Sequence, residues 1–344
     1  MAIKVAINGF GRIGRLAFRR CVESGKFEVV AINDLVDAKT LAYLLKYDTT
    51  HGQFCPDKIG ANEEKNCIVF DGKEIPILNK KDPHELNWKD YGVDLVLECT
   101  GRFKGKADAQ VHLDNGAKGV VISAPSDKET PTFVYGVNTN EMTKEMTIVS
   151  GASCTTNCLA PVCKVLEEKW GIDVGYMTTV HAYTNDQTIL DLAKGNLRRG
   201  RAAAANIVPT TTGAAKAIGL VIPSLNGRMN GGAIRVPVTD GSLVDLSLVM
   251  KVKGITEAEI NAAMKAAAEG ELKGVLGYTE DEIVSSDILG MTYGSMFDAT
   301  QTKILKGPDG TELVKVVAWY DNEYSYTCQY VRCAEHMAKV LGIE

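Results

Sequence analysis

The sequence lacks any apolar run approaching the ~20 residues that cross a bilayer. It also lacks an excess of basic charge, because 38 Lys and Arg stand against 43 Asp and Glu for a net charge of −5. No overall positive field therefore attracts the chain to nucleic acid or to an anionic membrane. The first strand-like run begins at Ile3, so we expect no signal or transit peptide. We expect a cytoplasmic protein that has no membrane partner and no nucleic acid as its primary partner.

The cysteines and histidines do not form a recognisable framework. Nine cysteines are an odd number scattered over 344 residues, which is typical of reduced thiols in a cytosol. Cys154 and Cys158 form a C-x3-C pair, but no second Cys/His cluster completes a zinc site, and the five histidines are dispersed. We therefore predict no metal site.

A glycine-rich turn follows the first strand-like run, Ile3 to Ile7. The turn reads Asn8-Gly9-Phe10-Gly11-Arg12-Ile13-Gly14 and leads into a helical pattern. In this context the first glycine permits a tight turn, the second lets backbone approach a pyrophosphate, and the third lets helix and strand pack closely. Asp34 ends the next strand, where a carboxylate would bond the adenosine ribose and repel a 2′-phosphate. The pattern predicts NAD binding; the alternative is a glycine turn beside a surface acid.

The order of the expected elements indicates an α/β protein with two domains, which the length allows. Apolar strands at 28–33, 94–99 and 119–123 alternate with helices, as in a Rossmann-type doubly wound parallel sheet. Ligands bind beyond the carboxyl ends of such strands, so Thr100 and Ser123 are expected to line the site. A hairpin around Asp71-Gly72 reads as an insertion. Later strands at 175–184, 232–238 and 242–250 predict an α+β domain with a mostly antiparallel or mixed sheet, in which the last two pair through a turn at 239–241.

The stretch from Gly151 to Cys158 lies where a strand gives way to a helical pattern. Free N–H groups and the helix dipole at such a position favour a cysteine thiolate, which makes Cys154 a candidate nucleophile. The alternative is a small buried structural residue. Pro161 lacks an N–H, so either the helix proper begins near it or the helix is locally distorted.

A histidine partner for this cysteine is available on the next strand. His181 lies 27 residues after Cys154, and a helix followed by an antiparallel strand could return it to the helix start. Such a pair can hold the thiolate as an ion pair and exchange protons with a substrate oxygen. A structural histidine is an equal alternative on this evidence alone.

Groups suited to anions follow His181 in the sequence. Thr184 closes the same strand, the basic run 198–201 lies in a long irregular stretch from 185 to 206, and a threonine–glycine sequence at 210–213 opens a helix. A helix start of this kind is a ready anion site. Arg235 lies in an apolar strand, where either an anionic ligand or a structural acid would satisfy it. The basic run could also be a solvated face or a nucleic-acid patch.

Over essentially the whole chain, the sequence resembles the phosphorylating glyceraldehyde-3-phosphate dehydrogenase family. The resemblance is carried by the glycine turn 8–14, Ala152-Ser153-Cys154-Thr155-Thr156-Asn157-Cys158, His181-Ala182-Tyr183-Thr184, Thr212-Gly213 and Trp319-Tyr320-Asp321-Asn322-Glu323. The cysteine motif is far more specific to that family than the glycine turn.

The resemblance implies an NAD-dependent oxidation of glyceraldehyde 3-phosphate to 1,3-bisphosphoglycerate through a cysteine hemithioacetal and thioester. It implies that Cys154 is the nucleophile and His181 its acid/base partner. It also implies a site for attacking inorganic phosphate at Ser153, Thr155, Thr212 and Gly213, and a site for the substrate's own phosphate at Thr184 and Arg235, with Arg199 shared. The cofactor contacts it implies are Arg12, Ile13, Asp34, Ser123 and Asn322, which join Gly9, Gly11, Gly14, Lys81 and Thr100.

The family also implies an assembly and a domain division. The expected NAD-binding domain covers residues 1–153, with the terminal helix at 322–344 packing on it, and the catalytic domain covers 154–321. The expected assembly is a homotetramer in which the stretch 185–206 runs along a neighbouring subunit. Two positions depart from common family members: Lys81 replaces arginine near the adenine, and Ala193 replaces proline after Leu192.

Two other functions fit the same motifs. Erythrose-4-phosphate dehydrogenase shares the cysteine motif, but its product is a free acid. Dependence of NADH formation on inorganic phosphate therefore separates it from the phosphorylating dehydrogenase. A surface adhesin or RNA-binding role belongs to another class, and the intact catalytic groups make any such role additional.

Overall fold

The computed structural model describes residues 2–343, and these form two compact units. Unit 1 contains the chain up to Tyr135, then Thr139–Ala152 and the residues from Tyr330 onward. Unit 2 contains Gly136–Asn138 and Ser153–Gln329, so the division between the units falls inside the last helix, α7 (Tyr324–Leu341). No helix among residues 2–343 has the length and hydropathy of a membrane span.

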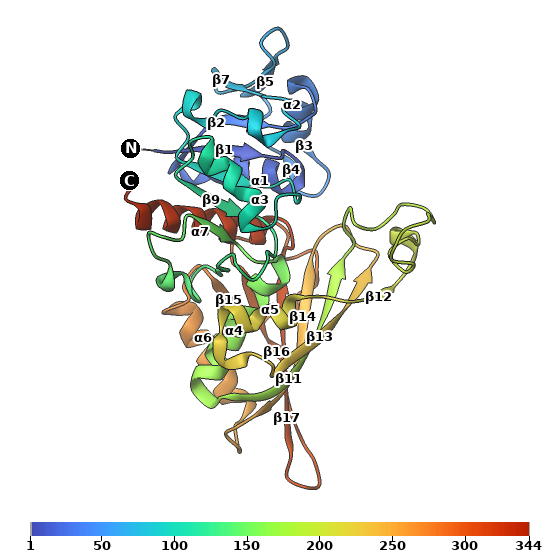
Figure 1. Cartoon of the computed structure of the whole chain (residues 1–344). Coiled ribbons are helices and arrows are strands. Elements are labelled where there is room, and N and C mark those ends of the chain that lie inside the picture. Colours follow the sequence, from blue (N-terminus) through green and yellow to red (C-terminus); the bar gives the residue numbers. More distant parts are fainter. Residues whose placement is uncertain (1, 344) are drawn as a thin grey trace. The chain divides into compact units, whose positions relative to one another are not determined.

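Unit 1 is built on a five-stranded sheet with the order β10-β9-β8-β1-β2, and every neighbouring pair in it is parallel. Its strands are β1 (Ile3–Asn8), β2 (Phe27–Asn33), β8 (Leu95–Glu98), β9 (Gly119–Ile122) and β10 (Ile148–Ser150). The helices are α1 (Arg12–Ser24), α2 (Ala38–Lys46) and α3 (Lys106–Asp114), of which α1 contacts β1 and β2 while α3 contacts β9 and β10 (Figure 1). The predicted doubly wound parallel sheet is confirmed. Strands β8 and β9 are buried along their whole length, which explains why they read as continuous apolar runs.

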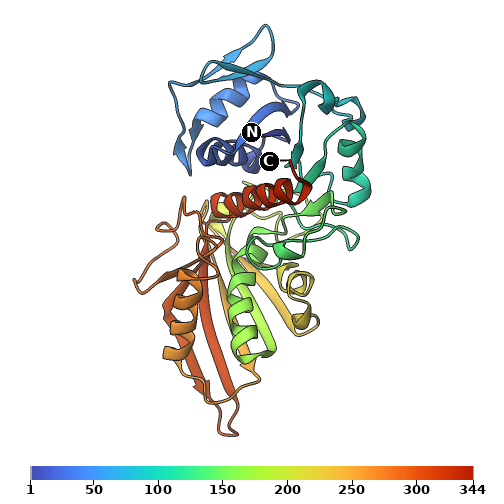
Figure 2. The ribbon, with the colours of Figure 1, turned by 90° about the vertical axis from the view of Figure 1, so that its left-hand side faces the viewer.

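Unit 2 is built on a seven-stranded mixed sheet with the order β12-β13-β11-β14-β17-β16-β15, as predicted. Its strands are β11 (Ile172–Ala182), β12 (Val208–Thr210), β13 (Met229–Val236), β14 (Ser242–Met250), β15 (Leu276–Thr279), β16 (Ser295–Lys306) and β17 (Glu312–Tyr320). The helices α4 (Cys154–Trp170), α5 (Ala214–Val221) and α6 (Glu257–Glu269) lie along this sheet (Figure 2). Buried and partly exposed residues alternate strictly along β14, because one face of the sheet meets the helices.

The predicted pairing of the strands at 232–238 and 242–250 is wrong. Strand β11 lies between β13 and β14, pairing in parallel with the first and antiparallel with the second. A close approach at Gly231 helps to explain this order, because a Cβ there would lie 2.4 Å from the Met177 carbonyl oxygen. The parallel register places His181 opposite Arg235.

Short elements complete the two units. The remaining strands are β3 (Tyr47–Asp48), β4 (Gly52–Gln53), β5 (Ile59–Asn62), β6 (Cys67–Phe70) and β7 (Lys73–Pro76), and the 3-10 helices are η1 (Pro83–Glu85), η2 (Trp88–Tyr91), η3 (Thr139–Glu141), η4 (Ala203–Ala205) and η5 (Pro223–Leu225). The predicted hairpin at Asp71-Gly72 is confirmed as β6 and β7, and β5 adds a third strand to it.

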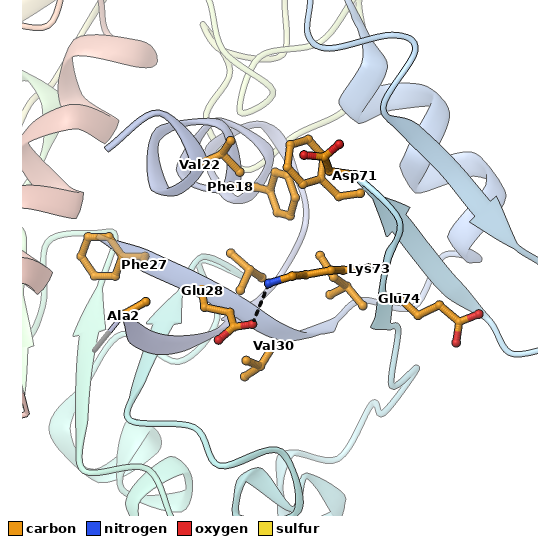
Figure 3. A pocket seen from close by; sticks show the side chains of 12 residues that line it. Ala2, Phe18, Val22, Phe27, Glu28, Val30, Asp71, Lys73 and Glu74 are labelled. Carbon is orange, nitrogen blue, oxygen red and sulfur yellow. Dashed lines mark hydrogen bonds and ion pairs between the residues drawn. The ribbon is translucent and has the colours of Figure 1, made fainter. Parts of the chain in front are cut away.

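A hollow of about 470 Å³ lies between α1, β2 and β7 in unit 1. Phe18, Val22 and Phe27 form part of its apolar wall, and Lys73 reaches across it to pair with Glu28 at 3.3 Å (Figure 3). The other two carboxylates at its rim, Asp71 and Glu74, pair with lysines. This hollow therefore offers an apolar interior and a charge-balanced rim, and it contains none of the predicted site residues.

Candidate active site

The chain turns sharply before Cys154. Strand β10 ends at Ser150, Ala152 adopts a left-handed φ of 59°, and α4 starts at Cys154. Ser153 caps this helix, its hydroxyl accepting a hydrogen bond from Thr156 N at 3.1 Å. The cysteine thus occupies the first helical position, as expected from the strand-to-helix pattern. The alternative that the helix begins near Pro161 is wrong, because Pro161 lies inside it, where the surrounding α4 side chains are buried.

Cys154 and His181 are in contact. Cys154 Sγ lies 3.5 Å from His181 Nε2, and both residues belong to unit 2. His181 Nδ1 lies 2.7 Å from the Ala182 carbonyl oxygen, which can only accept, and 3.0 Å from Arg235 Nη1, which can only donate. We assign the ring proton to Nδ1 because the contact with the carbonyl is the shorter of the two. The lone pair of Nε2 therefore faces the thiol. His181 lies near the end of β11, and this strand brings it back to the start of α4, as the sequence predicted.

The electrostatic setting favours uncharged forms of both groups. Burial, followed by the positive charge of Arg235, lowers the pKa of His181 to about 3. Burial raises the pKa of the Cys154 thiol, although Arg235 and Thr155 oppose that rise. Taken one at a time, the thiol and the imidazole are therefore each favoured in the neutral form. Desolvation outweighs the help that the helix start gives to the thiolate.

Arg235 joins this pair from β13. Its Nη1 lies 3.0 Å from His181 Nδ1 and donates to the Ala182 carbonyl at 2.9 Å, and it is 3.4 Å from Thr184 Oγ1. Its Nε is buried without a hydrogen-bond partner, and no carboxylate among residues 2–343 forms an ion pair with it. A partly buried guanidinium whose Nε lacks a hydrogen-bond partner is suited to an anionic ligand. The structure thus brings together Cys154, His181, Thr184 and Arg235.

A second cationic group lies in the stretch 185–206. Arg199 forms an ion pair with Asp186, and it donates from Nε to Thr210 Oγ1 at 3.0 Å and from Nη2 to the Thr211 carbonyl at 3.1 Å. Its charge contributes to the lowered pKa of His181, so it acts within electrostatic range of the pair. The adjacent Thr212 accepts from Ala214 N at 3.2 Å, and Gly213 is the N-cap of α5 without a side-chain cap.

Sequence reasoning missed several groups that hold the site. The buried Tyr320 hydroxyl lies 2.8 Å from both Thr155 Oγ1 and Thr179 Oγ1, and its ring meets that of His181 edge-on at 5.7 Å. Ser242 donates to Asn322 Oδ1 at 2.6 Å and accepts from Ala182 N at 3.0 Å. Tyr320 belongs to the motif 319–323 that carries part of the family resemblance, and this motif was the signal that could have identified it. Nothing in the sequence singled out Ser242.

A separate cavity of about 290 Å³ lies in unit 1 at the carboxyl ends of β1, β2 and β8. Of the predicted cofactor contacts, it is lined by Gly9, Gly11, Asp34, Lys81 and Thr100. The Asp34 carboxylate is fixed there by Phe10 N at 2.7 Å and Val36 N at 3.1 Å. Its lining does not include Arg12, Ile13, Gly14 and Ser123, whereas Asn322 belongs to unit 2.

The glycine turn beside this cavity fits a dinucleotide. A Cβ at Gly14 would lie 2.0 Å from the Gly9 carbonyl oxygen, so only glycine allows this approach of helix and turn. Nothing lies within 4 Å of a Cβ built at Gly11, and the first turn of α1 carries no acidic residue. The N-terminus of α1 is therefore open to an anion. Arg12 is held by Asp48 through contacts of 2.7 and 3.2 Å.

A doubly wound nucleotide-binding unit joined to a unit with a thiol and an imidazole in contact defines the class of dehydrogenases that act through cysteine. Family models agree: glyceraldehyde 3-phosphate dehydrogenase, NAD binding domain, matches residues 3–106, and glyceraldehyde 3-phosphate dehydrogenase, C-terminal domain, matches 153–322. The chain belongs to the glyceraldehyde 3-phosphate dehydrogenase family.

Curated relatives match nearly the full length of the chain. It is 55% identical to glyceraldehyde-3-phosphate dehydrogenase of Clostridium pasteurianum over 339 residues, which cover 98% of this chain and 99% of the relative. It is 54% identical to glyceraldehyde-3-phosphate dehydrogenase 1 of Bacillus cereus over 335 residues, 97% and 98% of the two chains. It is also 54% identical to glyceraldehyde-3-phosphate dehydrogenase of Streptococcus pyogenes serotype M1 over 344 residues, 99% of each.

Proposed function

We propose that this protein catalyses the NAD-dependent oxidative phosphorylation of glyceraldehyde 3-phosphate to 1,3-bisphosphoglycerate. The observation that carries the proposal is the 3.5 Å contact between Cys154 Sγ and the unprotonated His181 Nε2 beside Arg235. A thiol, a base and a cation at one point are the groups that covalent oxidation of an anionic aldehyde requires. Family membership supports the same chemistry.

In the first step, Cys154 Sγ attacks the aldehyde carbon while its proton passes to His181 Nε2 and on to the new oxygen, forming a hemithioacetal. His181 Nε2 then removes the hydroxyl proton as the carbon is oxidised, which leaves a thioester on Sγ. Inorganic phosphate attacks the thioester carbon, the C–S bond breaks, Sγ regains a proton, and one proton is released to solvent. Because the pKa of His181 is lowered, the ring starts this cycle as a free base.

Two sets of groups would hold the two phosphates. For the phosphate of the aldehyde we propose Thr184, Arg235 and Arg199, supported by the buried unpaired Nε of Arg235. For the attacking phosphate we propose Ser153, Thr155, Thr212 and Gly213. The start of α5 supports this assignment, because its N-cap Gly213 has no side chain to cover the helix N–H groups.

NAD, when bound, supplies the acceptor for the hydride that leaves the substrate carbon. We propose that its pyrophosphate lies against the turn of Gly9, Gly11 and Gly14, and that Asp34 binds the adenosine ribose. The remaining proposed contacts are Arg12, Ile13, Lys81, Thr100, Ser123 and Asn322. Because Ser242 fixes the Asn322 oxygen, the Asn322 amide N–H groups remain to orient the nicotinamide carboxamide.

A spectrophotometric assay tests the reaction and its alternative. We expect NADH formation with glyceraldehyde 3-phosphate to require inorganic phosphate or arsenate, because the thioester otherwise stays on Cys154. Rapid phosphate-independent oxidation of erythrose 4-phosphate would instead identify the acid-forming dehydrogenase. Replacing NAD by NADP in the same assay measures the discrimination assigned to Asp34.

We also propose that the chain works as a homotetramer. The stretch 185–206 supports this, because Ile189, Leu190 and Leu197 are 88%, 76% and 84% exposed in the single chain. Light scattering after size exclusion should give four chains, and the double variant I189D/L190D should shift the protein to smaller species. An unchanged mass for that variant would show that this stretch is not the interface.

Two further assignments accompany the proposed reaction. The functional division follows residues 1–153 and 154–321 with the terminal helix 322–344 in the first part, and the boundary between Ala152 and Ser153 supports it. The nine free thiols suit a cytoplasmic site of action. Cell fractionation with activity measured in each fraction tests that location.

A further inference from the structure

A chain of buried, hydrogen-bonded side chains, here called the relay, lies next to the cofactor cavity of unit 1. Its outer end is Trp88 in η2, its centre is His112 in α3, and its inner end is Glu98, the last residue of β8. Trp88 and His112 are 0% exposed and Glu98 is 1% exposed. None of these three residues lines the cavity, and the proposed chemistry uses none of them.

The partners of His112 fix its tautomer. Trp88 Nε1 lies 3.1 Å from His112 Nδ1, and an indole N–H can only donate, so Nδ1 accepts. The ring proton is therefore on Nε2, which donates to Glu98 Oε2 at 3.1 Å. The ring also meets Phe103, a cavity-lining residue, edge-on at 6.0 Å.

Glu98 connects this donor to the lining of the cavity. Its Oε1 accepts from Thr100 N at 2.8 Å and from the Thr100 hydroxyl, and its Oε2 accepts from Asn8 Nδ2 at 2.6 Å. No Lys or Arg among residues 2–343 pairs with this buried carboxylate. Hydrogen bonds alone therefore hold this carboxyl group in place, and the loss of one donor should disturb the others.

The relay continues along the carboxyl ends of the strands. Asn33 Nδ2 donates to Asn8 Oδ1 at 2.8 Å and to the Lys80 carbonyl at 3.0 Å, while Asn33 Oδ1 accepts from Lys80 N at 2.9 Å. The ends of β8, β1 and β2 are thus tied together, and Asp34 follows directly after Asn33. Asn8, Asn33, Lys80 and Thr100 all line the cavity.

We propose that His112 is a positioning residue for the adenosine part of the NAD site. It orients the Glu98 carboxylate, which sets the backbone and side chains of Asn8 and Thr100 at the cavity wall. This inference deepens the cofactor site of the proposed function, and binding measurements test it separately from the oxidation chemistry.

The test compares H112L with H112Q and W88F by isothermal titration of the full-length protein with NAD and with ADP-ribose. H112L removes the donor to Glu98 while keeping an apolar volume, and we expect the Kd for both ligands to rise about tenfold. H112Q keeps an N–H donor and should stay within about threefold of the wild type. W88F frees Nδ1 without removing the imidazole, and a rise of about threefold is expected.

A stability-matched control separates positioning from general destabilisation. Ile68 is 0% exposed in β6 and contacts none of the relay residues through a hydrogen bond, so I68A should lower the Tm without changing either Kd. In steady-state assays H112L should raise the KM for NAD about tenfold and leave kcat and the aldehyde KM within about twofold. If H112L does not fold, H112Q and W88F carry the test.

The proposal is overturned if the folded His112 and Trp88 variants bind ADP-ribose within about twofold of I68A. It is also overturned if H112Q and H112L raise the Kd equally, because the donor to Glu98 would then be irrelevant.

Discussion

The two units each bury a histidine, and the contrast between them is instructive. His112 is 0% exposed and His181 is 4% exposed, yet their rings carry the proton on opposite nitrogens. In unit 1 the indole of Trp88 forces the proton of His112 onto Nε2, which meets a carboxylate. In unit 2 the Ala182 carbonyl holds the proton of His181 on Nδ1, so that a lone pair faces a thiol.

The partners of each ring therefore separate a structural histidine from a reactive one. Both ring nitrogens of His112 are engaged by groups that stay in place, whereas Nε2 of His181 faces a group that can react. Burial and the positive charge of Arg235 lower the pKa of His181 and keep its ring unprotonated. No Lys or Arg among residues 2–343 pairs with Glu98, the partner of His112. Burial alone distinguishes neither role.

The largest effect is expected for C154S, which replaces the reacting sulfur by a poorer nucleophile. We expect kcat to fall by about 10⁴-fold or more. The Kd for NAD, measured by titration calorimetry, should not change, because the residues lining the cofactor cavity all belong to unit 1. Phosphate-dependent oxidation within tenfold of the wild-type rate would show that Cys154 is not the nucleophile.

The next largest effect is expected for H181Q, which removes the base. A fall in kcat of roughly 10²–10³-fold follows from the loss of proton transfer. Alkylation of Cys154 by iodoacetamide at neutral pH should slow as well, since the Nε2 acceptor beside Sγ is gone. The matched variant H112Q should leave both the alkylation rate and kcat within about twofold of the wild type. If H181Q and H112Q changed kcat and the alkylation rate equally, the two histidines would not differ in role.

A smaller effect, on substrate binding, is expected for R235Q. Loss of the guanidinium should raise the KM for the aldehyde by about 10–100-fold, as for one or two charge-assisted hydrogen bonds. The KM for NAD should stay near its wild-type value. R235K should recover only part of the loss, because a single ammonium cannot reproduce the planar fork. An unaltered aldehyde KM in R235Q would remove Arg235 from the phosphate site.

The smallest effect is a slope in stability with pH. The pKa of His181 falls from 6.5 to about 3 on folding, so between these values the unfolded chain binds a proton that the folded chain does not. The contribution of His181 to the free energy of unfolding is complete above pH 6.5. It decreases as the pH falls, by up to about 1.4 kcal/mol per pH unit. Urea unfolding at pH 6.5, 5.5 and 4.5 should show a shallower loss in H181Q than in the wild type. Parallel curves for the two proteins would contradict the lowered pKa.

Much of the fold was accessible from local patterns. Continuous apolar runs predicted the parallel sheet of unit 1, and the glycine turn marked the start of α1, because Gly14 tolerates no side chain against Gly9. The position of Cys154 at the start of a helix was also predicted. The sequence left open whether Pro161 begins the helix or lies inside it, and the structure places it inside, among buried neighbours.

The order of strands in unit 2 was not accessible in the same way. The turn at 239–241 suggested a local pair, but β11 takes the place between β13 and β14. The position of β11 between these strands places His181 opposite Arg235. The same nonlocal strand pairing that made the prediction wrong therefore assembles the site. Tyr320 and Ser242 enter it from distant strands for the same reason.

The sequence by itself determined the residue types of this protein: a glycine turn with a following acid, a cysteine at a helix start, and a histidine and arginine in apolar strands. Only the tertiary structure decided which of these residues meet and in which protonation state. Residue types and local periodicity act through neighbours in the chain, whereas pKa values and tautomers depend on burial and on partners that distant segments supply. For that reason the motif identified Cys154 and His181, but only the packing around them shows that burial opposes a charge on each of these groups.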